Sequence, residues 1–173
     1  LALAQQIVQP LRAMTLLENV ALACGAAKTD SPFTAMASYE RVSENKRALE
    51  LLSQVGLGEV ADQEPAKLPL GYLKRLEVAR AMALNPKLLL LDEPTRGVDV
   101  GAKQEIYSLI RQASQEGKSV LMVSSELGEL IGLCDRILVL RDGQIYHELQ
   151  TAGLREADLL AYCQGVRAAE ITE

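Results

Sequence analysis

The segment LLLLDEPTRGVD, residues 88–99, constrains the fold more than any other part of the chain. Four consecutive leucines run directly into Asp92, Glu93 and Pro94. A short, continuous apolar run of this kind predicts a strand that is buried on both faces, as in a parallel sheet. Ligands of such sheets bind beyond the carboxyl ends of the strands. The segment therefore predicts two adjacent carboxylates at a ligand-binding edge; the simpler alternative is a strand that ends in a solvated acidic turn.

The rest of the pattern places helices and strands around this strand. The expected elements are a strand over 1–9, helices over 14–24, 40–55 and 71–84, a strand at 88–91, a helix over 102–116, a strand over 119–125, a helix over 126–133, a strand over 136–141, a hairpin strand over 144–149 and a helix over 154–163. The expected apolar faces comprise Leu16, Leu17, Val20 and Leu22; Leu49, Leu51, Leu52 and Val55; and Ile106, Leu109, Ile110 and Ala113. Strands alternating with helices predict an α/β fold with a parallel sheet, a helical subdomain in the first half and a C-terminal β-hairpin.

Composition excludes several classes of protein. The net charge of −5 argues against a nucleic-acid-binding protein, which needs a basic face. The apolar runs are far shorter than the roughly 20 residues of a membrane-spanning helix, and the start of the chain has no secretory signal. Cys24, Cys134 and Cys163 are interpreted as reduced core thiols of a cytosolic protein. His147, the one histidine, is interpreted as an ordinary surface or half-buried residue.

Two carboxylates at the end of a buried strand suit phosphoryl transfer. Asp92 could hold Mg²⁺ through water, because Mg²⁺ keeps several waters and takes one or two carboxylates together with phosphate oxygens. Glu93 could then orient or deprotonate an attacking water.

The longer segment LPLGYLKRLEVARAMALNPKLLLLDEPTRGVD, residues 68–99, resembles the ATP-binding subunits of ABC transporters. The resemblance extends from about Gln6 to Ile145 and implies a P-loop NTPase-like core. It implies that Asp92 is the Walker B aspartate that holds Mg²⁺ and that Glu93 is the catalytic glutamate. It further implies that Asp99 is the D-loop aspartate and that Gln6, at the Q-loop position, contacts Mg²⁺ and the γ-phosphate.

Two further motifs depart from the family pattern. The residues Leu68, Pro69, Leu70, Gly71 and Tyr72 occupy the position of the signature loop; Gly71 fits the family pattern, whereas Pro69, Leu70 and Tyr72 depart from it and the serine hydroxyl is missing. Ser125 stands where the family carries a histidine that contacts the γ-phosphate. Together these departures leave open a nucleotide site that hydrolyses poorly.

The glycine-rich Walker A loop, GxxxxGK[ST], is absent from the chain. Gly117-Lys118-Ser119 imitates its end, but here a helix precedes a strand, so Gly117 is interpreted as a helix cap and Lys118 as a solvated charge. Because the chain also begins without methionine, we expect one partial ATPase domain. Its parts are a helical subdomain over 10–84, a catalytic core over 85–150 and a C-terminal helix and tail over 151–173.

The resemblance implies an ABC-type ATPase, using ATP and Mg²⁺, that energises solute import. The C-terminal half favours a sugar and the first half a branched-chain amino acid as the solute. Expected partners are a second ATP-binding domain, transmembrane permease subunits contacted by about residues 6–20 and, indirectly, a solute-binding protein. The expected location is the cytoplasmic face of the membrane. The alternatives are a non-hydrolytic regulatory half-site and a fragment without activity, and we expect the isolated chain to be inactive.

Overall fold

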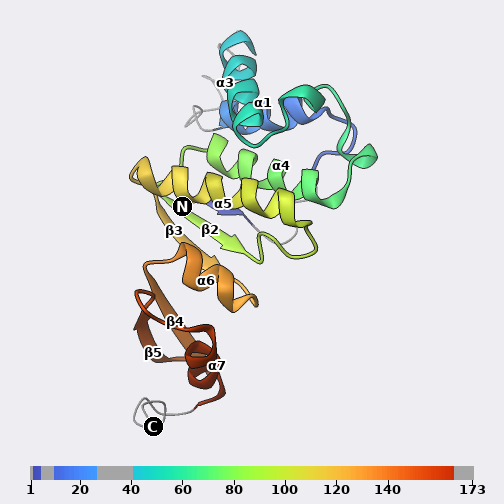
Figure 1. Cartoon of the computed structure of the whole chain (residues 1–173). Helices are drawn as coiled ribbons and strands as arrows, with labels where there is room; N and C mark the ends of the chain where they lie inside the picture. Colours follow the sequence, from blue (N-terminus) through green and yellow to red (C-terminus); the bar gives the residue numbers. More distant parts are fainter. Residues whose placement is uncertain (1, 5–9, 27–40, 166–173) are drawn as a thin grey trace. The chain divides into compact units, whose positions relative to one another are not determined.

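The computed structural model of the chain describes residues 2–4, 10–26 and 41–165 (Figure 1). Its elements are β1 (Ala2–Ala4), α1 (Leu16–Ala26), α3 (Arg41–Gln54), the 3₁₀ turns η1 (Gly58–Val60) and η2 (Pro65–Lys67), α4 (Leu70–Ala83), β2 (Leu88–Asp92), α5 (Val100–Gln115), β3 (Ser119–Val123), α6 (Leu127–Leu133), β4 (Arg136–Arg141), β5 (Gln144–Gln150) and α7 (Glu156–Gln164). The chain divides into two compact units, residues 1–121 and residues 122–173. The expected α/β order of elements is confirmed.

The sheet of the first unit has the strand order β1–β2–β3. β1 and β2 run parallel, with Ala2 opposite Leu89 and Ala4 opposite Leu91. Leu89 and Leu91 are fully buried or nearly so, while Leu88 and Leu90 on the other face are half-buried. The four-leucine run is therefore a parallel strand with a core face, as its sequence indicates.

Coverage of β3 differs from the expectation. Leu121 and Val123 are 50% and 52% exposed, whereas Val120 and Met122 are half-buried. Exposure alternates with a period of two, so one face of the strand is covered and the other is not. A parallel sheet is expected to be covered on both faces, and β3, which has β2 as its only neighbour in the described sheet, departs from that expectation.

Helix α1 begins at a capping box formed by Thr15 and Glu18, within the segment MTLLENV, residues 14–20. The Thr15 N–H donates to Glu18 Oε2 at 2.8 Å, and the Glu18 N–H donates to Thr15 Oγ1 at 3.1 Å. Asn19 is 1% exposed; its Oδ1 accepts the Leu11 N–H at 2.9 Å, and its amide donates to backbone oxygens including Leu11 O at 3.1 Å. This side chain fixes the segment that enters the helix.

The inward stripes of α1 and α3 are shifted from the expected ones. In α1 the fully buried positions are Leu16, Val20 and Cys24, while Leu22 is 54% exposed. In α3 the buried positions are Ala48, Leu51, Leu52 and Val55, while Leu49 is 46% exposed. At about 100° per residue, Leu49 is turned by about 100° from the buried Ala48, and Leu22, two residues from both Val20 and Cys24, lies on the side of α1 opposite the core face.

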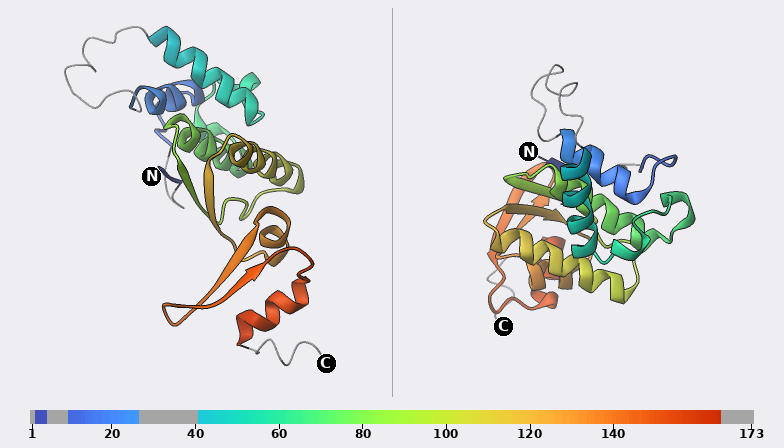
Figure 2. Two further views of the ribbon diagram at one scale, coloured as in Figure 1. Left: turned by 90° about the vertical axis from the view of Figure 1, so that its left-hand side faces the viewer. Right: turned by 90° about the horizontal axis from the view of Figure 1, so that it is seen from above.

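Helix α4 is covered by its neighbours along most of its circumference. It contacts α1, α3, α5 and β1, and its small and apolar residues are buried at Leu76, Val78, Ala79, Ala81 and Met82. Figures 1 and 2 show α4 and α5 lying side by side. The ion pair Lys74–Glu77, at 3.4 Å, is largely enclosed, and burial raises the pKa of Glu77 while Lys74 opposes that rise.

The segment Gly117-Lys118-Ser119 lies between a helix and a strand, as expected. α5 ends at Gln115, Gly117 has a left-handed φ of +84° and β3 begins at Ser119. The interpretation of Gly117 as a helix cap is therefore confirmed. Lys118 is a correction: its side chain is only 13% exposed and pairs with Glu116.

The second unit is a hairpin packed against two short helices. β4 and β5 are antiparallel, joined by Asp142 and Gly143, which both have positive φ as a type I′ turn requires. The core of this unit is Ile137, Val139 and Leu159, surrounded by half-buried apolar residues from α6, β5 and α7.

The three cysteines are all free, but they do not share one environment. Cys24 is buried and Cys134 is half-buried, whereas Cys163 is exposed on α7, so its assignment to the core was wrong. His147 is half-buried, as expected, with its ring edge-to-face against Tyr162. None of the helices that the structure describes combines the length and the apolar character that a membrane crossing demands.

Candidate functional site

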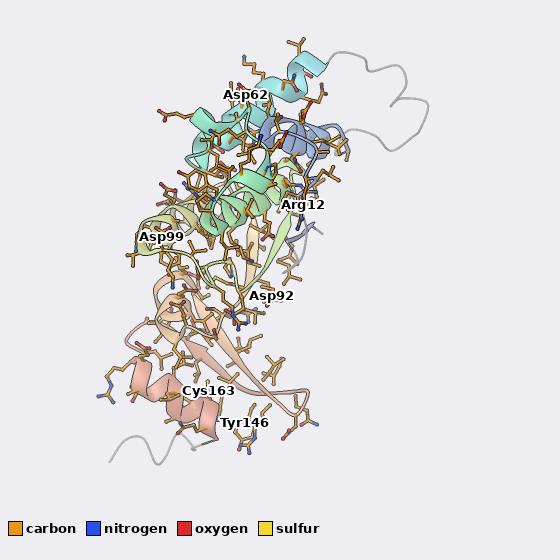
Figure 3. All side chains as sticks on the ribbon, turned by 90° about the vertical axis from the view of Figure 1, so that its right-hand side faces the viewer. Arg12, Asp62, Asp92, Asp99, Tyr146 and Cys163 are labelled. Carbon is orange, nitrogen blue, oxygen red and sulfur yellow. The ribbon has the colours of Figure 1, made fainter. Side chains whose placement is uncertain are left out.

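The candidate site begins at the carboxyl end of β2. Asp92, labelled in Figure 3, is the last residue of the strand. Glu93 follows it with a left-handed φ of +47°. Both carboxylate residues are half-buried, while Pro94 and Thr95 behind them are buried. A left-handed conformation is unfavourable for a residue with a Cβ, by roughly 1–2 kcal/mol. The turn therefore holds Glu93 in a backbone conformation that its own preference disfavours.

The turn after Glu93 leads directly into α5. The Arg96 N–H donates to Glu93 O at 3.3 Å, and the Val98 N–H donates to Thr95 O at 3.1 Å. Asp99 then caps α5, because its Oδ1 accepts the Ala102 N–H at 3.0 Å. This backbone hydrogen bond is the main reason that the pKa of Asp99 is lowered. Sequence spacing placed the helix start two residues too late, since it did not include this cap.

The loop before α4 packs on the same turn. A Cβ added to Gly71 would lie 3.3 Å from the Ala102 Cβ and 3.4 Å from Asp99 Oδ2. A Cβ added to Gly97, whose φ is +76°, would lie 3.1 Å from Leu70 Cδ2. The two motifs, 25 or more residues apart in sequence, therefore meet at glycines that allow close backbone approach.

The surface that this loop presents is apolar. Pro69 caps α4 without a side-chain hydrogen bond, and its carbonyl accepts the Tyr72 N–H at 3.0 Å. Pro69 is exposed and Leu70 is 49% exposed, while Leu68 and Tyr72 are half-buried. The start of a 14-residue helix favours an anion through its unpaired N–H groups. Here Pro69, at the N-cap, offers neither a side-chain hydroxyl nor an N–H to such a contact.

Arg75 is a residue of this region that the sequence analysis missed. Its Nη1 pairs with Glu105 of α5 and donates to Val55 O at 3.3 Å, and its guanidinium lies 4.5 Å from the Tyr72 ring centroid. The one local signal is an arginine three residues after an aromatic residue, which is common on helices. Glu105 is 30 residues further on, so sequence spacing could not identify the pair.

Ser125 belongs to the second unit, where it follows β3 and is exposed. Its neighbour Ser124 donates to Glu129 Oε2 at 2.9 Å and accepts the Glu126 N–H at 3.0 Å. Gln6 lies outside the described residues.

The donors at the end of β2 fit Mg²⁺ better than a softer metal. Asp92 and Glu93 offer carboxylate oxygens, which suit Mg²⁺, and the described part of the chain contains no cluster of three or more His, Cys, Asp or Glu residues able to hold a metal by themselves. Mg²⁺ does not need such a cluster, because it is commonly bound by one or two carboxylates, waters and substrate phosphates.

Comparison with known proteins gives consistent matches. A family model described as ABC transporter matches residues 1–96, which is more than half of the 173 residues. A ribose import ATP-binding protein of Rhizobium meliloti is 41% identical over 134 residues, covering 75% of this chain and 26% of the relative. A xylose import ATP-binding protein of Paraburkholderia xenovorans is 49% identical over 96 residues, covering 56% of this chain and 18% of the relative. The chain thus spans about a quarter or less of these two relatives.

Solved structures match the fold. One is a dimeric ATP-binding cassette in a post-hydrolysis state bound to ADP and Pi, with a TM-score of 0.75 and 28% identity, covering 87% of this chain and 62% of that chain. Another is the ADP conformation of an ATP-binding cassette of an ABC transporter, with a TM-score of 0.72 and 25% identity, covering 99% of this chain and 68% of that chain. The expected P-loop NTPase-like α/β fold is confirmed.

Proposed function

Because the chain belongs to the ABC transporter family, we propose that it provides ATP-binding and ATP-hydrolysing machinery that energises solute import. The observation that carries this proposal is the convergence of two motifs at one place. The strand end with Asp92 and Glu93 leads into the turn capped by Asp99, and Gly71 of the loop before α4 packs against that turn.

In this proposal the two carboxylates have different tasks. Asp92 ends β2 and would hold Mg²⁺ through water, consistent with its half-buried position. Bound Mg²⁺ would supply charge neutralisation for the phosphates. Glu93, held by its left-handed backbone, would orient an attacking water and accept its proton.

The remaining predicted residues would complete the nucleotide site. Gly71 and the start of α4, with Leu68, Pro69, Leu70 and Tyr72, would face the phosphates of a nucleotide bound by a second ATP-binding domain. Asp99 would connect the two sites, Gln6 would contact Mg²⁺ and the γ-phosphate, and Ser125 would stand at the γ-phosphate side.

The proposed solute is a sugar rather than a branched-chain amino acid. The ribose and xylose import ATP-binding proteins among the relatives support this choice. The proposed partners are transmembrane permease subunits and, through them, a solute-binding protein, and the proposed location is the cytoplasmic face of the membrane. The dimeric cassette among the similar structures supports pairing with a second ATP-binding domain.

A second candidate function is a nucleotide-binding half-site that does not hydrolyse ATP. The observation in its favour is the apolar surface of Pro69 and Leu70, together with Ser125 at the histidine position. Such a half would bind nucleotide and complete the site of an active partner.

The substitution Glu93→Gln in the protein as its gene encodes it separates the two candidates. We expect ATP turnover to fall by about 10²–10⁴-fold, the range for loss of a general base, with the affinity for MgATP retained. Glu126→Gln, at the N-cap of α6, is the matched control and should leave turnover unchanged. Binding of MgATP without turnover in the unsubstituted protein would support the regulatory half-site, and absence of both binding and turnover would contradict both candidates.

A further inference from the structure

Arg75 joins three helical segments that meet below the loop before α4. It lies on α4 and is 6% exposed. Its Nη1 reaches Val55 O just after the end of α3, at 3.3 Å, and also Glu105 on α5. Its guanidinium plane covers Tyr72, the last residue of the loop motif, at 4.5 Å. We call Arg75, Tyr72, Glu105 and the Val55 carbonyl the Arg75 cluster.

The cluster is spatially restricted. A Cβ added to Gly56, whose φ is +66°, would lie 2.9 Å from Arg75 Nη1 and 3.3 Å from Glu105 Oε2. The chain therefore makes its turn after α3 with a residue that leaves room for the guanidinium. A planar guanidinium can stack on an aromatic ring and bind a carboxylate at the same time, which an ammonium group cannot do in the same geometry.

The cluster is also placed between the two halves of the candidate site. Tyr72 lies one residue after Gly71, which packs against Asp99, and Glu105 lies on the helix that Asp99 caps. Backbone hydrogen bonds are the main reason that the pKa of Asp99 is lowered, and the charge of Arg75 lowers it further. Arg75 therefore acts on that carboxylate.

We propose that the Arg75 cluster is a positioning device that couples the loop before α4 to the start of α5. In this device the Tyr72 ring connects Arg75 to the loop. Tyr72 stands where the resemblance places a glutamine, so the aromatic contact belongs to this chain's own variant of the loop. The relevance of the coupling to nucleotide turnover rests on the proposed function; the coupling itself does not.

Two properties favour a positioning role over a purely stabilising one. Nε of Arg75 is buried without a hydrogen-bond partner, so the guanidinium is held in a place that does not satisfy all its donors. The Glu105 side chain is 48% exposed, so the ion pair is open to solvent on one side and can be exchanged. A device that transmits movement needs contacts that are specific in geometry and not too strong to change.

Backbone amide hydrogen exchange on the chain tests the coupling. The reporters are Leu73 N–H, bonded to Pro69 O at 3.4 Å, and Ala102 N–H, bonded to Asp99 Oδ1 at 3.0 Å. We expect Tyr72→Leu to accelerate exchange at Ala102 about tenfold, corresponding to loss of a buried cation–π contact. Glu105→Gln perturbs the cluster from its α5 side, and it should accelerate exchange at Leu73 on α4. Tyr72→Phe, which keeps the ring face, should change neither.

Two further variants distinguish coupling from general stability. Arg75→Lys keeps the charge but loses the planar group, and we expect it to accelerate exchange at both reporters; protection equal to that of arginine would overturn the proposal. Arg47→Ala is the matched control, because Arg47 forms an exposed ion pair with Glu50 at 3.3 Å on α3, and it should leave both reporters unchanged. The proposal would also be overturned if Tyr72→Leu accelerated amide exchange only within α4. It would likewise be overturned if exchange in α1 accelerated as much as exchange at Ala102.

Turnover in the protein as its gene encodes it gives the second measurement. We expect Glu105→Gln to lower kcat about tenfold while the affinity for MgATP changes by less than about twofold, because Glu105 acts on the geometry of the cluster and is not among the residues placed at the nucleotide. An unchanged kcat would show that the coupling has no role in turnover. If the unsubstituted protein neither binds nor hydrolyses ATP, the proposed function fails, while the exchange result still decides the coupling.

Discussion

Two of the described turns from a strand into a helix, β2 into α5 and β3 into α6, handle their acidic groups differently. After β2, the turn uses left-handed backbone at Glu93 and Gly97, and Asp99 caps a helix of 16 residues. After β3, residues 124–126 have no positive φ, and α6 has 7 residues and no side-chain cap. There the Ser124 hydroxyl donates to Glu129, which is 6% exposed.

This difference separates a turn suited to a ligand from one suited to local packing. The first turn leaves Asp92 and Glu93 half-buried at a strand end and adopts strained backbone to do so. The second turn places its carboxylate inside, where a neighbouring hydroxyl binds it. Strained backbone beside ionisable groups points to function more strongly than the acidic residues alone, because both turns are acidic.

After Glu93→Gln, the largest effect is expected from Asp92→Asn, which also removes one charge from the first turn. In the protein as its gene encodes it, ATP turnover should fall by at least about tenfold, and the Mg²⁺ concentration for half-maximal turnover should rise, because an amide holds Mg²⁺ less well than a carboxylate. Turnover measured across a Mg²⁺ titration checks this. Glu126→Gln, which removes a charge from the second turn, should leave the Mg²⁺ dependence as it was; an equal shift in both variants would remove the distinction between the turns.

Ser124→Ala tests the packing role of the second turn. The substitution takes one hydrogen bond from the buried Glu129 carboxylate, and we expect the free energy of unfolding to fall by about 1–3 kcal/mol. Urea unfolding of the chain measures it. Ser119→Ala, at the exposed start of β3, is the control and should stay within about 0.5 kcal/mol. If both variants unfold alike, the hydroxyl at Ser124 does not stabilise the turn.

The sequence predicted the first turn well because its signals are local. Four leucines define β2, and the following Asp92, Glu93 and Pro94 define its end, so no distant contact was needed. The second turn was predicted as a site on the basis of Ser125 alone. The hydroxyl that the structure shows bound to Glu129 belongs to Ser124, and adjacent serines cannot be told apart by spacing.

The features that the sequence could not reveal depend on contacts across many residues. Arg75 on α4 and Glu105 on α5 form an ion pair although they are 30 residues apart in sequence. The packing of Gly97 on Leu70 brings together the turn after β2 and the loop before α4. The exposure of Leu121 and Val123 depends on what covers β3, which no periodicity within the strand reports. Leu49 and Leu22 were misplaced because a run of apolar residues on a helix does not show which edge faces the core.

Gly97→Ala measures what the first turn requires of its glycine. Gly97 and Gly117 both have left-handed backbone, with φ of +76° and +84°, but only at Gly97 is there an atom, Leu70 Cδ2 at 3.1 Å, where a Cβ would go. Both substitutions should destabilise the chain, by about 1 kcal/mol for the backbone conformation alone. We expect Gly97→Ala to exceed Gly117→Ala in urea unfolding, and the excess reports the contact between the loops. Equal losses would mean that Leu70 moves aside freely.

The smallest effect is expected from the two helix caps. Asp99→Ala removes the side chain that accepts the Ala102 N–H, so the melting temperature at neutral pH should fall by a few degrees. Because the folded-state pKa of Asp99 is lowered, its stabilising contribution is fully present above the unfolded pKa of about 3.9 and is lost as pH falls through the folded value. The difference between Asp99→Ala and the unsubstituted chain should therefore shrink below about pH 4. Glu126→Ala, at a position without a capping hydrogen bond, should give a smaller difference at neutral pH. A loss at Asp99 that persists unchanged into acid would mean that the ionised carboxylate is not what stabilises the start of α5.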